Sequence, residues 1–226
     1  MTPIVRLYRP ADRSAVLEIA ADTGFFGAPV EAFLDDRRLM QDIFVAYYVD
    51  REPEHLWVAD LDDTTVGYIC GSVGGKAAAR GQARTSVAAV LRLLTFRYRV
   101  GALTRRYFLR VASAVLRGEY PHPDLRGYPA HLHINLAEAA RGFGLGKRLM
   151  DACLNQMTGL GVPGIHLNTT SLNAPAVKMY EKMGFQLLAR KRTQLWEPWL
   201  PGAEVENLVY GKPLVVGQSS APRPTS

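Results

Sequence analysis

Ten residues in the second half of the chain combine glycine with positive charge. They read RGFGLGKRLM from Arg141 to Met150, with glycines at Gly142, Gly144 and Gly146. The apolar run before them predicts a strand, and the pattern after them predicts a helix. Backbone N–H groups at the start of a helix lack intrahelical partners, and glycine lets a ligand approach them closely. Such a turn is suited to holding a phosphate or a diphosphate.

Two common nucleotide-binding motifs do not fit this turn. The dinucleotide motif G-x-G-x-x-G fails because Gly146 comes one residue early. The P-loop fails because Arg141 stands where its first glycine belongs, and Arg148 stands where its Ser or Thr belongs. The spacing that is present is Arg-x-x-Gly-x-Gly. A tight strand-to-helix turn without a ligand is the alternative interpretation.

A second block of candidate residues lies further along the chain. Residues 173–185 read NAPAVKMYEKMGF. Pro175 suits the first turn of a helix, where its missing N–H costs nothing. Asn173 and Tyr180 are seven residues apart, so both project from the same face of that helix. The block therefore predicts a helix that presents an amide and a phenol on one side.

Polar residues alternate along the strand expected at residues 130–136, before the glycine turn. His131, His133 and Asn135 share one face of this strand, and aliphatic residues take the other face. The ordinary pKa of imidazole is near ~6.5, so a histidine here can accept a proton at neutral pH. If this face meets a substrate, His133 is the best candidate for a general base. Hydrogen-bonded core histidines are the alternative.

The elements that must position these residues follow from hydrophobic patterns. They predict one α/β domain over residues 1–213 with a central mixed sheet flanked by helices, followed by a disordered tail at 214–226. Asp62 and Asp63 suit a hairpin turn between two of its strands. Strands are expected at 4–8, 55–59, 65–73, 130–136, 164–169, from 185 and at 204–210. Helices are expected from 12 to 20, at 30–45, in two pieces within 75–127, from the glycine turn to 159, and at 174–183.

The positive charge of the chain is concentrated between Gly75 and Tyr120. This segment holds ten Lys and Arg residues and one acid, Glu119, a charge of +9 in a chain whose formal net charge is +6. Two apolar stripes at helical spacing flank Gly101, which predicts a hairpin of two helices with solvated arginines. A surface for nucleic acid or anionic lipid is the alternative, although no nucleic-acid motif supports it. The stripes are Val87, Val90, Leu91, Leu94 and Tyr98, then Leu103, Tyr107, Val111, Ala114 and Val115.

Composition excludes several classes of protein. The two cysteines, Cys70 and Cys153, are too few for a disulfide framework or a thiolate-rich zinc site. No apolar run is long enough to predict a transmembrane helix, and the start of the chain lacks the layout of a secretory signal. These features predict a cytoplasmic protein with two buried thiols and no metal. A homodimer is compatible with the sequence, which does not decide the oligomeric state.

The glycine turn and residues 173–185 together resemble the GNAT superfamily of N-acetyltransferases. The first GNAT motif has Arg or Gln, two residues, Gly, one residue, and Gly or Ala. The second has Asn, then Pro-Ala, then Tyr, three residues and Gly-Phe. The resemblance covers roughly residues 130–188, and residues 75–127 have no counterpart in a minimal member. It implies a GNAT-like sheet with a basic helical insertion at 75–127. It also implies transfer of acetyl from acetyl-CoA to an unidentified amine by direct attack.

The resemblance also assigns roles to residues. The N–H of Ile134 would stabilise the oxyanion, and Tyr180 would protonate the departing thiolate. Some members place a catalytic glutamate early on the strand, where this chain has Ala130, so His133 or an ordered water would act as base. The residues expected to bind the cofactor are Ile134, Asn135, Leu136, Arg141, Gly142, Phe143, Gly144, Leu145, Gly146, Lys147, Asn173 and Tyr180.

A more local resemblance involves residues 128–136. They read YPAHLHINL and look like the corresponding strand in bacterial relatives of the acetyltransferase-like domain of O-GlcNAcase. Together with the missing glutamate, this resemblance implies an alternative function. The protein would then be a non-catalytic acetyl-CoA-binding module.

Overall fold

A seven-stranded mixed sheet forms the centre of the protein. The computed structural model describes residues 2–140 and 142–214. Neighbouring strands run antiparallel except for β4 and β5, which are parallel. This arrangement confirms the predicted fold class. In spatial order the strands are β1 (Pro3–Leu7), β2 (Leu56–Leu61), β3 (Thr64–Ser72), β4 (Ala130–Leu136), β5 (Gly164–Thr170), β7 (Val205–Pro213) and β6 (Gln186–Thr193).

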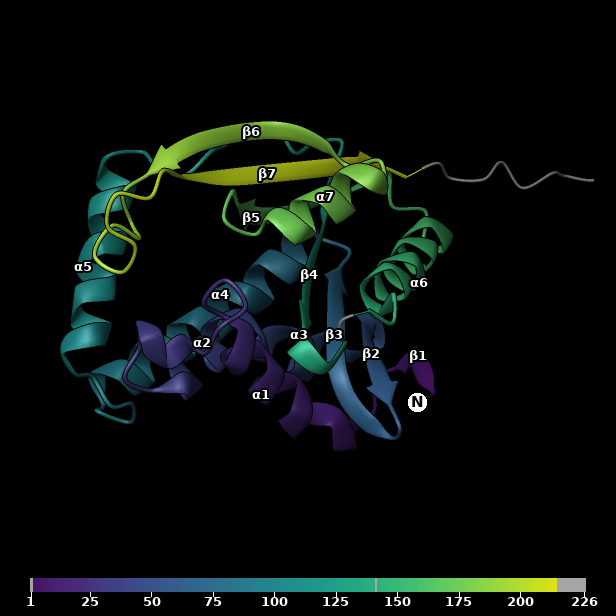
Figure 1. Cartoon of the computed structure of the whole chain (residues 1–226), viewed down its shortest axis with the longest axis horizontal. Helices are drawn as coiled ribbons and strands as arrows, with labels where there is room; N and C mark the ends of the chain where they lie inside the picture. The colour runs from purple at the N-terminus through teal and green to yellow at the C-terminus, as the bar shows by residue number, and fades with distance from the viewer. Residues whose placement is uncertain (1, 141, 215–226) are drawn as a thin grey trace, which may run out of the picture.

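Helices cover both faces of the sheet (Figure 1). One face of the β1–β4 half packs against α6, and α1 lies on the opposite face against β3 and β4. No helix of the described residues is long and apolar enough to cross a membrane. The α-helices are α1 (Arg13–Thr23), α2 (Arg37–Phe44), α3 (Ala46–Arg51), α4 (Gly75–Leu94), α5 (Ala102–Leu116), α6 (Leu145–Gly159) and α7 (Ala174–Lys182). Short 3₁₀ turns are η1 (Pro10–Asp12), η2 (Val30–Ala32), η3 (Pro53–His55) and η4 (Glu138–Ala140).

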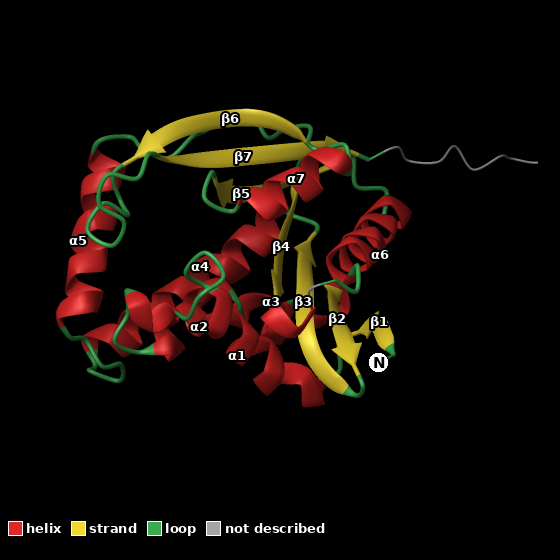
Figure 2. Ribbon diagram, viewed as in Figure 1, coloured by secondary structure: helices red, strands yellow, loops and turns green. Residues whose placement is uncertain are grey.

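The sheet opens between β4 and β5. These strands are in register only at Ala130 with Ile165 and at His131 with His166. Beyond that point they diverge, and Figure 2 shows β4 and β5 leaving each other at a wide angle. The remaining residues of β4 therefore pair with β3 but have no strand on their other side.

Three apolar cores hold the layers together. The largest lies between α6 and the sheet and includes Leu145, Leu149 and the buried free thiol of Cys153. The second packs α1 and α3 on β2 and β3, where the free thiol of Cys70 is buried. The third joins the α1–α2 segment to α5 and to the connection between β6 and β7. Both thiols are buried as predicted.

The turn between β2 and β3 agrees with the sequence. Asp62 and Asp63 both adopt positive φ angles, 48° and 62°. Two such residues make the turn that matches the natural twist of a hairpin. By contrast, the single helix predicted at 30–45 is wrong. The structure has η2 there, and α2 begins only after Asp36, whose carboxylate accepts the N–H of Arg38 at 3.1 Å and caps the helix.

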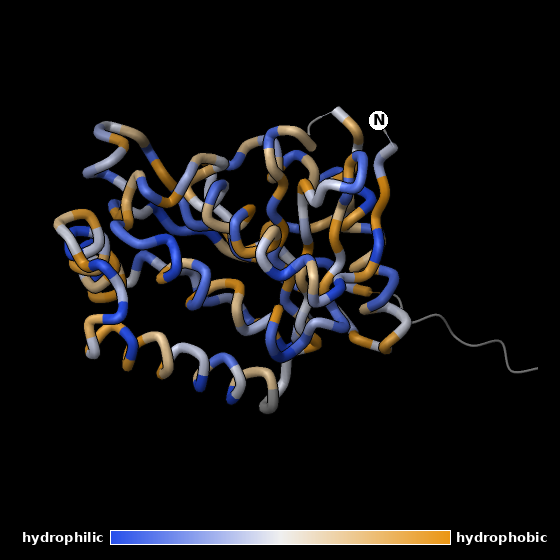
Figure 3. The backbone as a smooth tube through the Cα atoms, turned by 90° about the horizontal axis from the view of Figure 1, so that it is seen from below, coloured by the Kyte–Doolittle hydropathy of each residue, from blue (hydrophilic) through white to orange (hydrophobic). Residues whose placement is uncertain are grey.

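The two helices of the basic segment form as predicted, but they do not pack against each other as a hairpin. Helix α4 contacts α2 and α3, and α5 leaves the turn before Ala102 at a wide angle to α4 instead of folding back along it. Figure 3 shows α4 along the edge of the molecule, with α5 seen nearly end-on beside its C-terminal end. The hairpin prediction is therefore wrong.

The buried face of α4 is also not the predicted one. Val87, Leu91 and Leu94 are more than half exposed, while Ala78 and Ala89 are buried. Small residues are required on the inner side because α3 lies very close. A Cβ placed on Gly81 would lie 2.5 Å from the ring of Tyr47. Large aliphatic side chains on α4 therefore face outward.

Candidate functional site

The glycine turn connects η4 to α6. Gly142 and Gly144 have φ angles of 84° and 65°, which residues with a Cβ rarely adopt. A Cβ added to either would meet no atom within 4 Å. These glycines are therefore required by backbone conformation, and the space outside them is open to a ligand.

The start of α6 offers unpaired N–H groups beside this open space. The N–H of Arg148 donates to the carbonyl of Gly144 at 3.2 Å and begins the helical ladder. The N–H groups of Leu145, Gly146 and Lys147 precede that bond, so they have no partner within the helix. They lie at the positive end of the helix dipole. This geometry suits an anion.

Positive charge at the turn is partly paired within the protein. Lys147 forms an exposed ion pair with Asp151 one helical turn on, at 2.7 Å. Arg148 donates to the carbonyl of Pro3 at 2.8 Å, which ties α6 to β1. Arg141, which was expected to add charge here, lies outside the described residues.

The open edge of β4 directs backbone N–H groups into the gap. The N–H of Ala137 donates to the carbonyl of Val66 at 2.8 Å, and Ile134 stands opposite Ile69. In an antiparallel ladder, pairs that exchange hydrogen bonds alternate with pairs whose N–H groups point outward. Counting back from Ala137, the N–H of Ile134 points away from β3. It faces the side from which β5 has diverged.

Helix α7 borders the same gap. Asn173 is the residue before its first turn, and its side chain makes no capping bond, so the amide remains available on the cavity wall. Tyr180 is buried within the cavity lining. Burial raises the pKa of its phenol to about 12, so the phenol keeps its proton at neutral pH.

A cavity of about 450 Å³ brings several expected site residues together. Its lining includes His133, Ile134, Asn135, Asn173 and Tyr180. The glycine turn is not part of this lining. The side chain of Leu136, also expected at the site, turns to the α6 face, where it lies close to Gly146. The cavity and the glycine turn are thus two separate regions, and residues of β4 contact both.

The polar face of β4 is occupied as the alternation predicted. The Nδ1 atom of His131 lies 3.0 Å from the hydroxyl of Tyr48. The amide of Asn135 donates to the hydroxyl of Thr23 at 2.6 Å and accepts the hydroxyl of Tyr68 at 3.2 Å. These bonds fix both side chains and agree with the structural interpretation of the pattern.

His133 differs from its neighbours. Its Nε2 atom is buried and has no hydrogen-bond partner. Burial lowers the pKa of His133 to about 4. Burial together with the adjacent histidines His166 and His133 lowers the pKa of His131 to about 3. Both rings are therefore neutral at pH 7, and His133 has one nitrogen that can still accept a proton.

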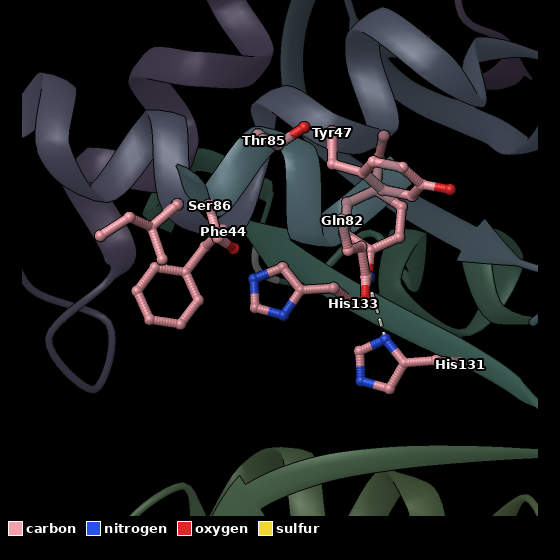
Figure 4. Close-up of a pocket in the computed structure, with 9 residues that line it drawn as sticks. Phe44, Tyr47, Gln82, Thr85, Ser86, His131 and His133 are labelled. Carbon is pink, nitrogen blue, oxygen red and sulfur yellow. Dashed lines mark hydrogen bonds between the residues drawn. The ribbon is translucent and has the colours of Figure 1, made fainter. Parts of the chain in front are cut away.

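A second, smaller cavity of about 190 Å³ lies on the side of α3 and α4. Figure 4 shows His131 and His133 projecting from β4 toward it, with His133 near Phe44 and Ser86. Phe44 and His133 line both cavities. The imidazole of His133 therefore stands at the boundary between the two spaces.

Known proteins with similar sequences and structures were found for this chain. Residues 110–185 fit the model of the acetyltransferase (GNAT) family. Over these residues the chain is similar to GNAT acetyltransferases. The match starts within α5 and ends at Phe185, so it includes the open strand, the glycine turn and α7.

Solved structures extend this likeness to almost the whole chain. The crystal structure of SsHAT is 29% identical with a TM-score of 0.68, and the match covers 95% of this chain and all of SsHAT. The protein yncA from Salmonella typhimurium, solved with acetyl-CoA, is 15% identical with a TM-score of 0.58 and full coverage of both chains. A phosphinothricin acetyltransferase from Sinorhizobium meliloti, solved with acetyl-CoA, is 16% identical with a TM-score of 0.57, covering 99% of this chain and 95% of that one. At such identities the last two show the fold alone. The relationship to O-GlcNAcase expected from residues 128–136 is not shown and stays a prediction.

Sequence reasoning missed one wall of the cavity. Aromatic residues from the α1–α2 segment, α5 and the β6–β7 connection line it opposite β4. They come from segments far apart in the chain and share no spacing, so no local pattern could reveal them. Among the described residues, no group of three His, Cys, Asp or Glu side chains is arranged to hold a metal ion.

Proposed function

We propose that this protein is an N-acetyltransferase that moves acetyl from acetyl-CoA to an amine by direct attack. The observation that carries the proposal is the outward N–H of Ile134, which faces a cavity that Tyr180 also lines. The similarity to GNAT acetyltransferases supports the reaction class. The acetyl-CoA reported with yncA and with the Sinorhizobium enzyme supports the choice of acyl donor.

The chain has groups that suit both ends of acetyl-CoA. The N–H groups of Gly144 to Lys147 and the open space over Gly142 would hold the diphosphate. The unpaired edge of β4 from Ile134 to Leu136 and the amide of Asn173 would hold the pantetheine arm. Acetyl-CoA supplies an activated acyl group as a thioester.

Ile134 would stabilise the negative charge that develops on the carbonyl oxygen. A backbone N–H is effective in this role because the sheet already fixes its direction, so no reorganisation is needed during the reaction. The hydrogen bonds that hold Asn135, the next residue, to Thr23 and Tyr68 keep this part of β4 in place.

Tyr180 would act as the general acid. Its phenol remains protonated because burial raises its pKa to about 12. It can therefore donate to the sulfur as the carbon–sulfur bond breaks.

His133 is the candidate base, through its unpartnered Nε2 atom. Because burial lowers the pKa of its imidazole to about 4, it is a weak acceptor in the resting protein. It would take the proton from the amine only after attack has made the nitrogen acidic. An ordered water could serve instead.

A second candidate function is a non-catalytic acyl-CoA-binding module. Ala130, at the position where some GNAT enzymes have a glutamate, is fully buried and has no ionisable group. If this alternative holds, acetyl-CoA binds but no amine is acetylated, and Tyr180→Phe changes nothing measurable.

Two measurements test the proposed function. Isothermal titration with acetyl-CoA should show binding, and thiol release should then increase on addition of a panel of amines. Absence of binding contradicts both candidate functions. Binding without amine-dependent thiol release contradicts acetyl transfer and favours the binding module.

A further inference from the structure

The wall of the cavity that faces β4 is aromatic. Six rings line it, and several touch one another. The centroids of Phe33 and Tyr107 lie 4.8 Å apart, and Trp196 meets Phe33 edge-on at 5.4 Å. The six are Phe26, Phe33, Phe44, Tyr107, Tyr120 and Trp196.

Helix α5 brings this wall together. Figure 1 shows α5 standing beside the end of β6 and the start of β7. Its Arg110 donates to the carbonyl of Gln194 in the β6–β7 connection, and its Tyr107 packs on Phe33 and Trp196. The inserted segment thus contributes to the cavity. The segment therefore has a structural role besides carrying positive surface charge.

The cavity has no group to balance a charge on the acceptor. None of the described residues that line it carries a carboxylate, a guanidinium or an ammonium group. The acidic side chains next to residues of the aromatic wall already accept hydrogen bonds from other groups of the protein. The carboxylate of Glu119, beside Tyr120, accepts from Thr193 and the N–H of Gln194, and that of Asp35, near Phe33, accepts the N–H groups of Gly101 and Thr104.

Charge outside the cavity also disfavours a polycationic acceptor. Helix α5 carries arginines and no acid, so its surface repels a polycation before it can enter. Inside, an unpaired charge on the body of the acceptor would lose its hydration without compensation. Aromatic rings, by contrast, pack well against an aromatic wall in offset or edge-on contact.

We propose, on the basis of the proposed acetyl transfer, that the acceptor is a primary amine attached to an uncharged aromatic group. Its ring would pack against Trp196, Tyr107 and Phe33, with the nitrogen directed toward β4. The nitrogen lone pair forms the new C–N bond and the C–S bond breaks. One amine proton leaves to His133 or water, and the sulfur takes a proton from Tyr180.

A panel of matched amines tests this acceptor class. Tryptamine and 2-phenylethylamine have an uncharged aromatic body, tryptophan adds a carboxylate, and spermidine is a flexible polycation. The kcat/KM for the first two should exceed that for tryptophan and for spermidine by about 10-fold or more. Equal or better use of tryptophan or spermidine overturns the inference and leaves acetyl transfer intact. If acetyl-CoA binds and no amine reacts, the proposed function fails and this inference fails with it.

A designed change of charge in the wall gives a second, independent test. Val111 lines the cavity from α5. Val111→Glu places a carboxylate there, and Val111→Gln has nearly the same size without the charge. Relative to the glutamine variant, the glutamate variant should raise kcat/KM for spermidine and lower it for tryptophan. An unchanged spermidine-to-tryptophan ratio of kcat/KM contradicts the proposed acceptor site.

If either Val111 variant fails to fold, Phe44→Ala replaces it. Phe44 is 44% exposed at the mouth of the cavity, so its loss should spare the core. KM for tryptamine should increase about 5-fold, because part of the aromatic contact is lost. The Kd for acetyl-CoA should not change. An unchanged KM overturns the packing of the acceptor against this wall.

Discussion

His131 and His166 are the last residues that β4 and β5 hold in register. Beyond this pair, β4 continues to Leu136 with β3 on one side and an open edge on the other. The open edge lies directly beside the cavity because residues of both diverging strands line it. A break in strand pairing therefore supplies both the space and the backbone donors of the proposed site.

The first prediction concerns the outward N–H of Ile134. Ile134→Pro removes this donor without removing a bond to β3, so kcat should fall about 100-fold or more. Ile134→Val keeps the donor and should remain within about 3-fold of the wild type. Steady-state kinetics checks both, with thermal unfolding to confirm that each variant is folded. A folded proline variant with nearly normal kcat would remove Ile134 from the mechanism.

The second prediction concerns the turn at the start of α6. Gly144 has a left-handed conformation, and a side chain there costs about 1 kcal/mol. Gly144→Val should also place atoms in the space over the helix start, so the Kd for acetyl-CoA should increase about 10-fold or more. Isothermal titration measures the change.

Gly159 offers a control for that substitution within the same helix. It belongs to α6, and an added Cβ would meet no atom within 4 Å. Gly159→Ala should leave the Kd unchanged and stabilise the protein by up to about 1 kcal/mol, as alanine does in a helix. Equal effects of the two variants on the Kd would show that the turn does not hold the ligand.

Local patterns predicted the parts of the fold that local chemistry determines. The glycine turn stood out because glycine allows the backbone conformations of such a turn. Asn173 and Tyr180 were singled out by their resemblance to the second GNAT motif, and the helical repeat places them on one face. The polar side of β4 followed from strand alternation. In each case neighbouring residues alone decide the outcome.

Tertiary contacts explain what the sequence could not reveal. The large aliphatic residues of α4 indicated a buried face, yet Tyr47 of α3 comes so close that small residues take the inner side. The aromatic wall needs Phe33 and Trp196, which are far apart in the chain, to meet through α5. No periodic pattern in the sequence indicates either the inner face of α4 or the aromatic wall.

The third prediction concerns the acid. Tyr180→Phe should lower kcat about 100-fold or more at neutral pH, because the sulfur then loses the proton donor that this phenol would supply. The Kd for acetyl-CoA should change far less than kcat. Since burial raises the pKa of Tyr180 to about 12, wild-type activity should show no loss from deprotonation of this phenol up to about pH 10.

Tyr210 provides the matched control for Tyr180. It is also buried, and its hydroxyl donates to Glu181 at 3.0 Å, outside the cavity lining. Tyr210→Phe should lower stability by about 1 kcal/mol through the lost hydrogen bond and leave kcat nearly unchanged. Similar kinetic losses in both variants would indicate a structural role for Tyr180.

The last prediction concerns acid stability. Burial lowers the pKa of His133 to about 4, whereas a histidine in the unfolded chain has a pKa near ~6.5. Between these values the unfolded chain binds a proton that the folded protein does not, so stability is complete above about pH 6.5 and is lost as the pH falls toward 4. At pH 5 the loss from His133 should be about 2 kcal/mol relative to pH 7.5. His131, with its pKa lowered to about 3, should add a similar loss.

Urea unfolding at pH 7.5 and pH 5 measures this difference. His133→Gln removes one titrating group, so the decrease in the free energy of unfolding should shrink by about 2 kcal/mol. The exposed His122 gives the control, and His122→Gln should leave the decrease as it is in the wild type. If His133→Gln loses as much stability at pH 5 as the wild type does, the imidazole of His133 is not held neutral by burial. The argument that burial makes His133 a weak proton acceptor in the resting protein would then have to be withdrawn.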